Sequence, residues 1–360
     1  MSLPKNEPRR LCTQWALRAA IGRVTDWAVQ LPKDTLFRTI SKGKLQALIW
    51  YHAGGMKGLQ AYLHPKDLDI LATRYTYLAF MHLHQVKLTT RVLSALHAEG
   101  INTVLLKGAA IAPLVYPDPA LRSMNDLDIL VSKSHASHAA EILKRIGAVE
   151  HELFPTRPAS RKTYHERVFQ FRPAEQLSLV VELHTGFAQY YRHPIDYDDW
   201  IERSIPIENT ARRLRDEDQL VHFALHSGRE LFMGPLKQLV DAHLWIENRS
   251  LCWDTVVETA KSAQAEYMLY ELLRLCSTFM ATEIPTQVFE ACAPPAMSRA
   301  LFRILHAPET GRLCRDGLQQ RVLECLTMLP LLSNSRQRAY FVAKYSSVRL
   351  ADTLATVPRV

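Results

Sequence analysis

Residues 122–131 read Arg-Ser-Met-Asn-Asp-Leu-Asp-Ile-Leu-Val, and this stretch decides the fold of the central part of the chain. Its turn-forming start and apolar, β-leaning end predict a strand over Asp126–Val131. Residues two apart in a strand point to the same face, so the carboxylates of Asp126 and Asp128 would converge. Such a pair repels unless a cation lies between its members, and proteins hold Mg²⁺ by one or two carboxylates plus substrate phosphates. The pair therefore predicts metal-assisted phosphoryl or nucleotidyl transfer.

The same five letters, Asp-Leu-Asp-Ile-Leu, occur earlier in the chain, at residues 67–71. His64-Pro65 before this copy is a helix-start signal, and the residues after it keep helical spacing. Side chains at positions i and i+2 of a helix do not face each other. We therefore predict that Asp67 and Asp69 are structural and that only the second copy can form a metal site.

A phosphate-binding element is predicted just before the acidic strand, where Leu-Leu-Lys-Gly stands at residues 105–108. A short strand would end there and a helix would begin at Gly108, whose missing side chain permits close backbone approach. Helix N-terminal amides attract phosphate, and Lys107 adds a point charge. Arg122, four residues before Asp126, could grip phosphate with its planar guanidinium. Lys107, Gly108 and Arg122 are thus the candidate nucleotide ligands.

A third carboxylate is offered by Glu182 in the strand-like segment Leu-Val-Val-Glu-Leu-His. A lone Glu among apolar strand residues is costly to bury unless it is paired or bound to a metal. Next to the Asp126 strand it would complete a site of three carboxylates, although an edge-strand Glu facing solvent is the alternative. His184 shares its face and is more often a packing or supporting residue than a ligand.

The wider pattern predicts an α+β protein with a small mixed-sheet core between helical regions. Residues 1–98 are predicted to form an N-terminal helical region, residues 99–190 the α/β core, and residues 191–360 a C-terminal helical domain. Strands are expected near 103–106, 126–131, 165–171 and 179–184, and a helix is expected over 134–146.

Composition narrows the setting and the partners. The chain of 360 residues is 48% hydrophobic and 22% charged, which is typical of a globular protein. No apolar run is long enough to span a bilayer. Six scattered cysteines without a Cys-x-x-Cys pair argue against a zinc or disulfide framework, and with no recognisable signal peptide they favour a cytoplasmic location. The net charge of +8 permits a polyanionic partner, although a solvated basic surface is the simpler explanation.

Residues 103–131, with Thr-Val-Leu-Leu-Lys-Gly and Met-Asn-Asp-Leu-Asp-Ile-Leu-Val, closely resemble the uncharacterised nucleotidyltransferase family of bacteria, part of the polymerase-β-like superfamily. The resemblance continues through Val-Val-Glu-Leu-His at 180–184. It implies a polymerase-β-like core in which Asp126, Asp128 and Glu182 hold two Mg²⁺ ions while an acceptor attacks the α-phosphate of an NTP such as ATP. The superfamily's usual Gly-Ser is Gly108-Ala109 here, which changes how phosphate could be bound.

Farther along, the family carries a His, then a basic residue, then an Asp, and these look like His226, Lys237 and Asp241. The resemblance implies that they, with His184, serve the acceptor or support the site. Lys237 and Asp241 are also spaced i, i+4 on one expected helix, so a surface ion pair of about 0.2–0.5 kcal/mol is the alternative.

The leading prediction is an enzyme that moves an NMP group from an NTP to an acceptor, which could be a small molecule, a peptide, a protein or RNA, and releases pyrophosphate. A non-catalytic nucleotide-binding partner in a biosynthetic or toxin–antitoxin assembly is the alternative. An enzyme acting on RNA ends is less favoured, because no basic stripe interleaved with aromatic residues is present. A membrane partner is not expected.

Overall fold

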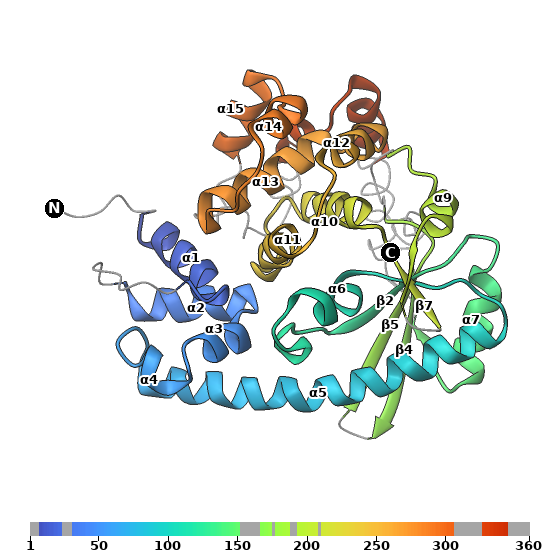
Figure 1. The fold of residues 1–360 in the computed structure, drawn as a ribbon, viewed down its shortest axis with the longest axis horizontal. Helices are drawn as coiled ribbons and strands as arrows, with labels where there is room; N and C mark the ends of the chain where they lie inside the picture. Colours follow the sequence, from blue (N-terminus) through green and yellow to red (C-terminus); the bar gives the residue numbers. More distant parts are fainter. Residues whose placement is uncertain are drawn as a thin grey trace, which may run out of the picture.

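A mixed sheet and the helices packed around it make this an α+β protein, as the sequence predicted (Figure 1). The computed structural model describes residues 7–23, 31–151, 166–174, 177–187, 193–207, 210–305 and 326–344. No helix in these ranges is long and apolar enough to cross a membrane.

The described N-terminal region is helical, and it ends in one long helix, α5 (Pro65–Ala98). Pro65 occupies the first turn of α5, where its missing N–H costs no hydrogen bond. The first Asp-Leu-Asp-Ile-Leu copy lies in this helix, which confirms that its two Asp residues do not form a strand pair. Four shorter helices precede α5: α1 (Glu7–Ala20), α2 (Lys33–Gly43), α3 (Gln46–His52) and α4 (Met56–Leu59).

Within the described residues the sheet has seven strands, in the order β3-β4-β5-β2-β1-β7-β6. Strand β2 pairs in parallel with β5 and antiparallel with β1, so the sheet is mixed at its centre. Strands β2 and β5 are rich in buried Leu, Ile and Val side chains, which suits strands covered by helices. The strands are β1 (Val104–Leu105), β2 (Asp126–Leu130), β3 (Val149–His151), β4 (Glu166–Ala174), β5 (Leu177–His184), β6 (Ile205–Ile207) and β7 (Ala211–Arg213).

The sheet extends beyond the segment expected to contain it. Strands β6 and β7 come from residues after 190, a region that the sequence predicted to be helical, and β7 pairs in parallel with β1. Strand β3 was also not foreseen. Each of these strands has three residues, which is too short for alternation to be recognised, and their pairing with distant segments forms them.

Helices α10 (Asp216–Arg229) and α11 (Lys237–Asn248) link the sheet to the C-terminal helices (Figure 1). Helix α11 packs on α6, and α1 packs on α13, so both helical regions contact elements far from them in sequence. The remaining elements are α6 (Lys107–Val115), η1 (Pro119–Leu121), α7 (Ala136–Arg145), α9 (Tyr197–Glu202), α12 (Trp253–Ser262), α13 (Glu266–Met280), α14 (Thr286–Cys292), α15 (Ala296–Leu305), η2 (Leu329–Leu331) and a helix at 335–344.

The four described cysteines are free thiols. Cys12, Cys276 and Cys292 are buried free thiols, and Cys252 is exposed. Cys314 and Cys325 lie outside the described residues.

Candidate active site

The acidic residues are brought together by the parallel pairing of β2 with β5. In this register Asp128 lies directly beside Glu182. Asp126, two residues before Asp128, points to the same face of the sheet. All three carboxylates line one cavity, which is described below. Asp128 is 2% exposed, whereas Asp126 and Glu182 are partly exposed. The structure thus brings together the three carboxylates that the sequence singled out.

Two basic side chains from different elements, a helix and a strand, contact Asp128. Lys107 Nζ, at the start of α6, lies 2.6 Å from Asp128 Oδ1 and 3.9 Å from Glu182 Oε2. His184 Nε2, on β5, lies 2.9 Å from the same Asp128 oxygen and 3.5 Å from Glu182 Oε2. The other ring nitrogen of His184 lies 3.6 Å from Glu166 Oε2 on β4. His184 therefore contacts three carboxylates, which is more than a packing role.

Burial and charge shift the protonation of this cluster. Burial raises the pKa of the Asp126 carboxyl, and the charge of Asp128 raises it further. Burial alone would raise the pKa of Asp128, but Lys107 and His184 hold it well below its usual range. Burial alone would lower the pKa of His184, yet its hydrogen bonds to Asp128 and Glu182 raise it to about 9. Lys107 and a protonated His184 thus supply the positive charge that two adjacent carboxylates need.

The backbone brings Lys107 to this position. Lys107 has φ +48°, a left-handed conformation that L residues seldom adopt, and it follows directly on Leu106, whose N–H donates to the Asp128 carbonyl at 3.1 Å. Helix α6 then begins without a side-chain cap. A Cβ at Gly108 would lie 2.7 Å from Met124 Cγ and 3.0 Å from Arg122 Nη1. Glycine is therefore required here for close packing against the segment that leads into β2.

The contacts of Arg122 differ from those expected of a phosphate ligand. Its Nε lies 2.8 Å and its Nη2 2.7 Å from the two carboxylate oxygens of Asp241, and its Nη1 donates to the Ser123 carbonyl at 2.7 Å. Tyr116 Oη donates to the same Asp241 at 2.5 Å. With Arg122 and Asp241 7% and 2% exposed, each guanidinium nitrogen already has a partner. The sequence could not reveal this pairing, because Asp241 lies 119 residues away.

Lys237 and Asp241 do not form the surface ion pair that their spacing allowed. Both are buried in α11, and Lys237 Nζ donates to the Ser123 carbonyl at 2.6 Å while Asp241 binds Arg122. They hold the segment before β2 from two adjacent turns of one helix. His226, on α10, lines the same cavity and contacts Gln238 at 3.2 Å.

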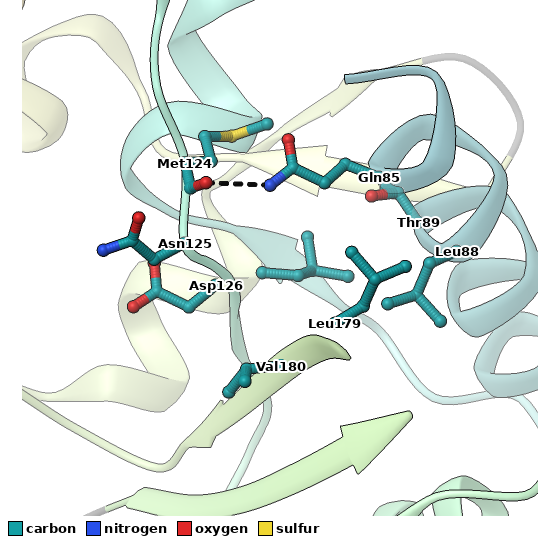
Figure 2. A pocket seen from close by; sticks show the side chains of 9 residues that line it. Gln85, Leu88, Thr89, Met124, Asn125, Asp126, Leu179 and Val180 are labelled. Atoms are coloured by element: carbon teal, nitrogen blue, oxygen red, sulfur yellow. Dashed lines mark hydrogen bonds between the residues drawn. The ribbon is translucent and has the colours of Figure 1, made fainter. Parts of the chain in front are cut away.

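Helix α5 holds this segment from the other side. Gln85 Nε2 donates to the Met124 carbonyl at 2.9 Å, as Figure 2 shows. Leu88 and Thr89 of α5 face Leu179 and Val180 of β5 across a small pocket beside Asp126. The chain entering β2 is therefore fixed by α5 and α11, and this fixes where Asp126 begins the strand.

A cavity of about 240 Å³ opens in front of the carboxylates. The site residues expected from the sequence border it, except that His184 and Asp241 lie behind its wall. It is also bordered by four charged residues that the sequence analysis did not select: Lys44, Glu166, Arg229 and Glu230. Lys44 and Arg229 stand in helical segments without a motif, while Glu166 could have been noticed as a charged residue at the start of an expected strand. The lining includes Lys44, Lys107, Gly108, Arg122, Asp126, Asp128, Glu166, Glu182, His226, Arg229 and Lys237.

The side chains fit a divalent cation. Ligand atoms of Asp128, Glu182 and His184 lie within 4.8 Å of one another, and Asp126 stands two residues along the same strand face. Carboxylate oxygens suit Mg²⁺, and imidazole suits softer metals. For Mg²⁺ the three carboxylates are therefore the better ligands.

The fold and the site thus define an α+β protein whose cavity contains a cluster of carboxylates that could hold a cation. The sequence model of the uncharacterised nucleotidyltransferase family matches residues 31–281. The chain belongs to this family, which supports nucleotidyl transfer as its reaction class.

No curated protein matches the sequence. Among solved structures, a tRNA-processing enzyme in its apo form is similar at 16% identity over 76% of this chain and 77% of that one, with a TM-score of 0.24. A tRNA nucleotidyltransferase complexed with a primer tRNA and an incoming ATP analog is similar at 15% identity over 74% and 84% of the two chains, with a TM-score of 0.20. Superpositions this loose define neither a shared site nor an acceptor.

Proposed function

We propose that this protein is a metal-dependent nucleotidyltransferase of the polymerase-β-like type, which transfers an NMP group from an NTP to an acceptor and releases pyrophosphate. One observation carries the proposal: Asp128 and Glu182 lie side by side on parallel strands, with Asp126 on the same face, at the wall of one cavity. Three converging carboxylates in a cavity that also contains lysines suit a metal-bound triphosphate.

In this proposal Asp126, Asp128 and Glu182 hold Mg²⁺, with room in the donor set for two ions. Bound there, Mg²⁺ would neutralise phosphate charge and favour attack on the α-phosphate. The ammonium of Lys107 lies 2.6 Å from Asp128 Oδ1. Released from Asp128, that ammonium can turn to the phosphates, and the uncapped start of α6 adds backbone N–H donors next to it.

Arg122 takes a supporting part instead of the phosphate-binding part expected from the sequence. Asp241, Lys237 and Gln85 hold the residues from Arg122 to Met124 in place. The strand that follows carries both Asp126 and Asp128, so these contacts position the metal ligands. This assigns Asp241 to positioning, as it does the one donor of Lys237 that binds Ser123, and leaves His226 at the cavity wall as a candidate acceptor contact.

The experiment is a pyrophosphate-release assay with a panel of NTPs, with and without Mg²⁺. The repeated pentapeptide provides a matched control, because Asp128→Asn alters the strand copy and Asp69→Asn alters the same position, which is exposed, of the helical copy. We expect release that depends on Mg²⁺, that is lost in Asp128→Asn and Glu182→Gln, and that is unchanged in Asp69→Asn.

Acceptor pools of small molecules, peptides and RNA, added separately, would identify which class stimulates release. Full activity in Asp128→Asn would contradict the assignment. Binding of NTP with Mg²⁺ but no release with any acceptor pool would favour the alternative of a non-catalytic nucleotide-binding partner.

A further inference from the structure

The cavity is lined by carboxylates and lysines from different elements. Asp126, Asp128 and Glu182 form its acidic end on the sheet, and Lys44 and Lys237 line it from the flanking helices. Glu230 also lines it, and its Oε2 accepts a hydrogen bond from Gln238 Nε2 at 2.8 Å. The two lysines come from segments far apart in the sequence: Lys44 is the C-cap of α2, and Lys237 lies in the first turn of α11. They meet here because Gly43 packs against Leu236: a Cβ at Gly43 would lie 3.1 Å from Leu236 Cβ.

Lys237 is a buried lysine for which the described residues offer no carboxylate ion pair. Its side chain is 9% exposed, and one of its donors is used by the Ser123 carbonyl at 2.6 Å. The nearby carboxylate of Asp241 is bound in both its oxygens by Arg122. Burial lowers the pKa of Lys237 to about 6, and the charges of Arg122 and Lys44 contribute. Near neutral pH the side chain of Lys237 is therefore held largely uncharged, and an anion bound beside it and Lys44 would favour its protonated form.

Lys44 is held in a conformation that its residue type seldom adopts. It has φ +55° at the C-cap of α2, a position that glycine usually takes. Glycine stands one residue earlier, in the sequence Lys42-Gly43-Lys44. Lys107, at the acidic end of the same cavity, is likewise left-handed, with φ +48°. Of the six described non-glycine residues with a left-handed backbone, these two lysines line the cavity.

We propose that Lys44 and Lys237 form a binding site for a phosphate group of one of the reactants, separate from the Lys107 end of the cavity. An ammonium suits phosphate as a point charge, and a pair can contact two of its oxygens. The phosphate would belong either to the acceptor or to the tail of the NTP. The assignment to a reactant rests on the proposed nucleotidyl transfer, whereas the anion site itself does not.

The test compares the wild-type protein with Lys44→Asn and Lys44→Gly by isothermal titration calorimetry. Asn and Gly both tolerate the left-handed conformation and remove the charge. Lys42→Asn is the matched control, since Lys42 is exposed on the same helix and does not line the cavity. One titration uses a non-hydrolysable ATP analogue with Mg²⁺. The other uses inorganic phosphate, with the analogue at saturation and again without it.

We expect Lys44→Asn to weaken one of these ligands by about tenfold or more, the loss of a charge-assisted hydrogen bond, while Lys42→Asn changes neither. Weakened analogue binding assigns the phosphate to the NTP, and weakened phosphate binding beside bound analogue assigns it to the acceptor. We also expect Lys44→Gly to raise the thermal midpoint while lowering affinity, because backbone strain is relieved.

Equal affinities of wild type and Lys44→Asn in both titrations would overturn the proposal. A fall of thermal midpoint and affinity together in Lys44→Gly would also overturn it, since Lys44 would then be structural. If the wild type fails to bind the analogue with Mg²⁺, the proposed function fails, and the titration with phosphate alone still decides the inference about Lys44.

Discussion

The buried pair of Arg122 and Asp241 offers the sharpest test of how the site is held. Asp241→Asn removes the negative charge that faces the guanidinium, but it keeps the size of the side chain and an acceptor for Tyr116. Arg122 and Asp241 have side chains that are 6% and 3% exposed, so the cation left behind is shielded from water. Breaking a buried pair in this way costs about 3–5 kcal/mol.

This cost converts into a measurable shift of the thermal midpoint. Unfolding entropy is about 2.1 cal/mol/K per residue. For cooperative unfolding of a chain of 360 residues, this entropy sums to roughly 0.75 kcal/mol/K. Asp241→Asn should therefore lower the midpoint by about 4–7 °C, and a surface pair of about 0.5 kcal/mol would shift it by less than ~1 °C. The assay is thermal unfolding followed by circular dichroism, with the exposed Asp69→Asn as the control.

A second variant separates loss of the ion pair from general damage. Replacing both charges, in Arg122→Met with Asp241→Asn, removes the stranded cation and should recover most of the lost midpoint. A shift below ~1 °C in Asp241→Asn would refute the reasoning and restore the interpretation of Asp241 as a helix-surface residue. A double variant that is less stable than Asp241→Asn alone would show that the buried charge is not the cause of the loss.

Three further predictions address packing, position and pH. Gly108→Ala should destabilise the fold by about 1–3 kcal/mol and weaken Mg²⁺-dependent NTP binding, because its Cβ would lie 2.7 Å from Met124 Cγ. Adding Met124→Ala should restore both stability and NTP binding. If calorimetry shows no recovery in the double variant, the steric cause is contradicted. Gln85→Ala, which frees the Met124 carbonyl, should lower stability by about 1 kcal/mol and slow pyrophosphate release; unchanged release would show that α5 does not position β2. His193, 8% exposed and bonded to the Ala263 carbonyl at 2.7 Å, has its pKa lowered by burial to about 4, so it stays neutral in the fold and protonates first in the unfolded chain. The contribution of neutral His193 to folding stability is therefore complete above pH ~6.5, and up to about 3 kcal/mol of it is lost as the pH falls toward ~4. Thermal midpoints measured across this pH range should fall less steeply in His193→Gln than in the wild type.

The sequence by itself determined the parts that depend on neighbours along the chain. The helix over Pro65–Ala98 follows from its start signal and apolar spacing, and the strand at Asp126 follows from an apolar run after turn residues. Because the side chains of a strand alternate, this strand placed Asp126 and Asp128 on one face without any knowledge of the rest of the molecule.

Only the tertiary structure decided which distant groups meet this strand. The register that sets Asp128 beside Glu182 joins residues 54 positions apart by number, and Asp241 reaches Arg122 across 119. An Arg near a phosphate site and an Arg bound to a buried Asp look the same in sequence, because charge compensation depends on where the partner lies. The three-residue strands β6 and β7 are likewise formed by pairing with a distant neighbour. Local pattern therefore placed the carboxylates, and long-range packing decided which charges compensate them and which remain available to a ligand.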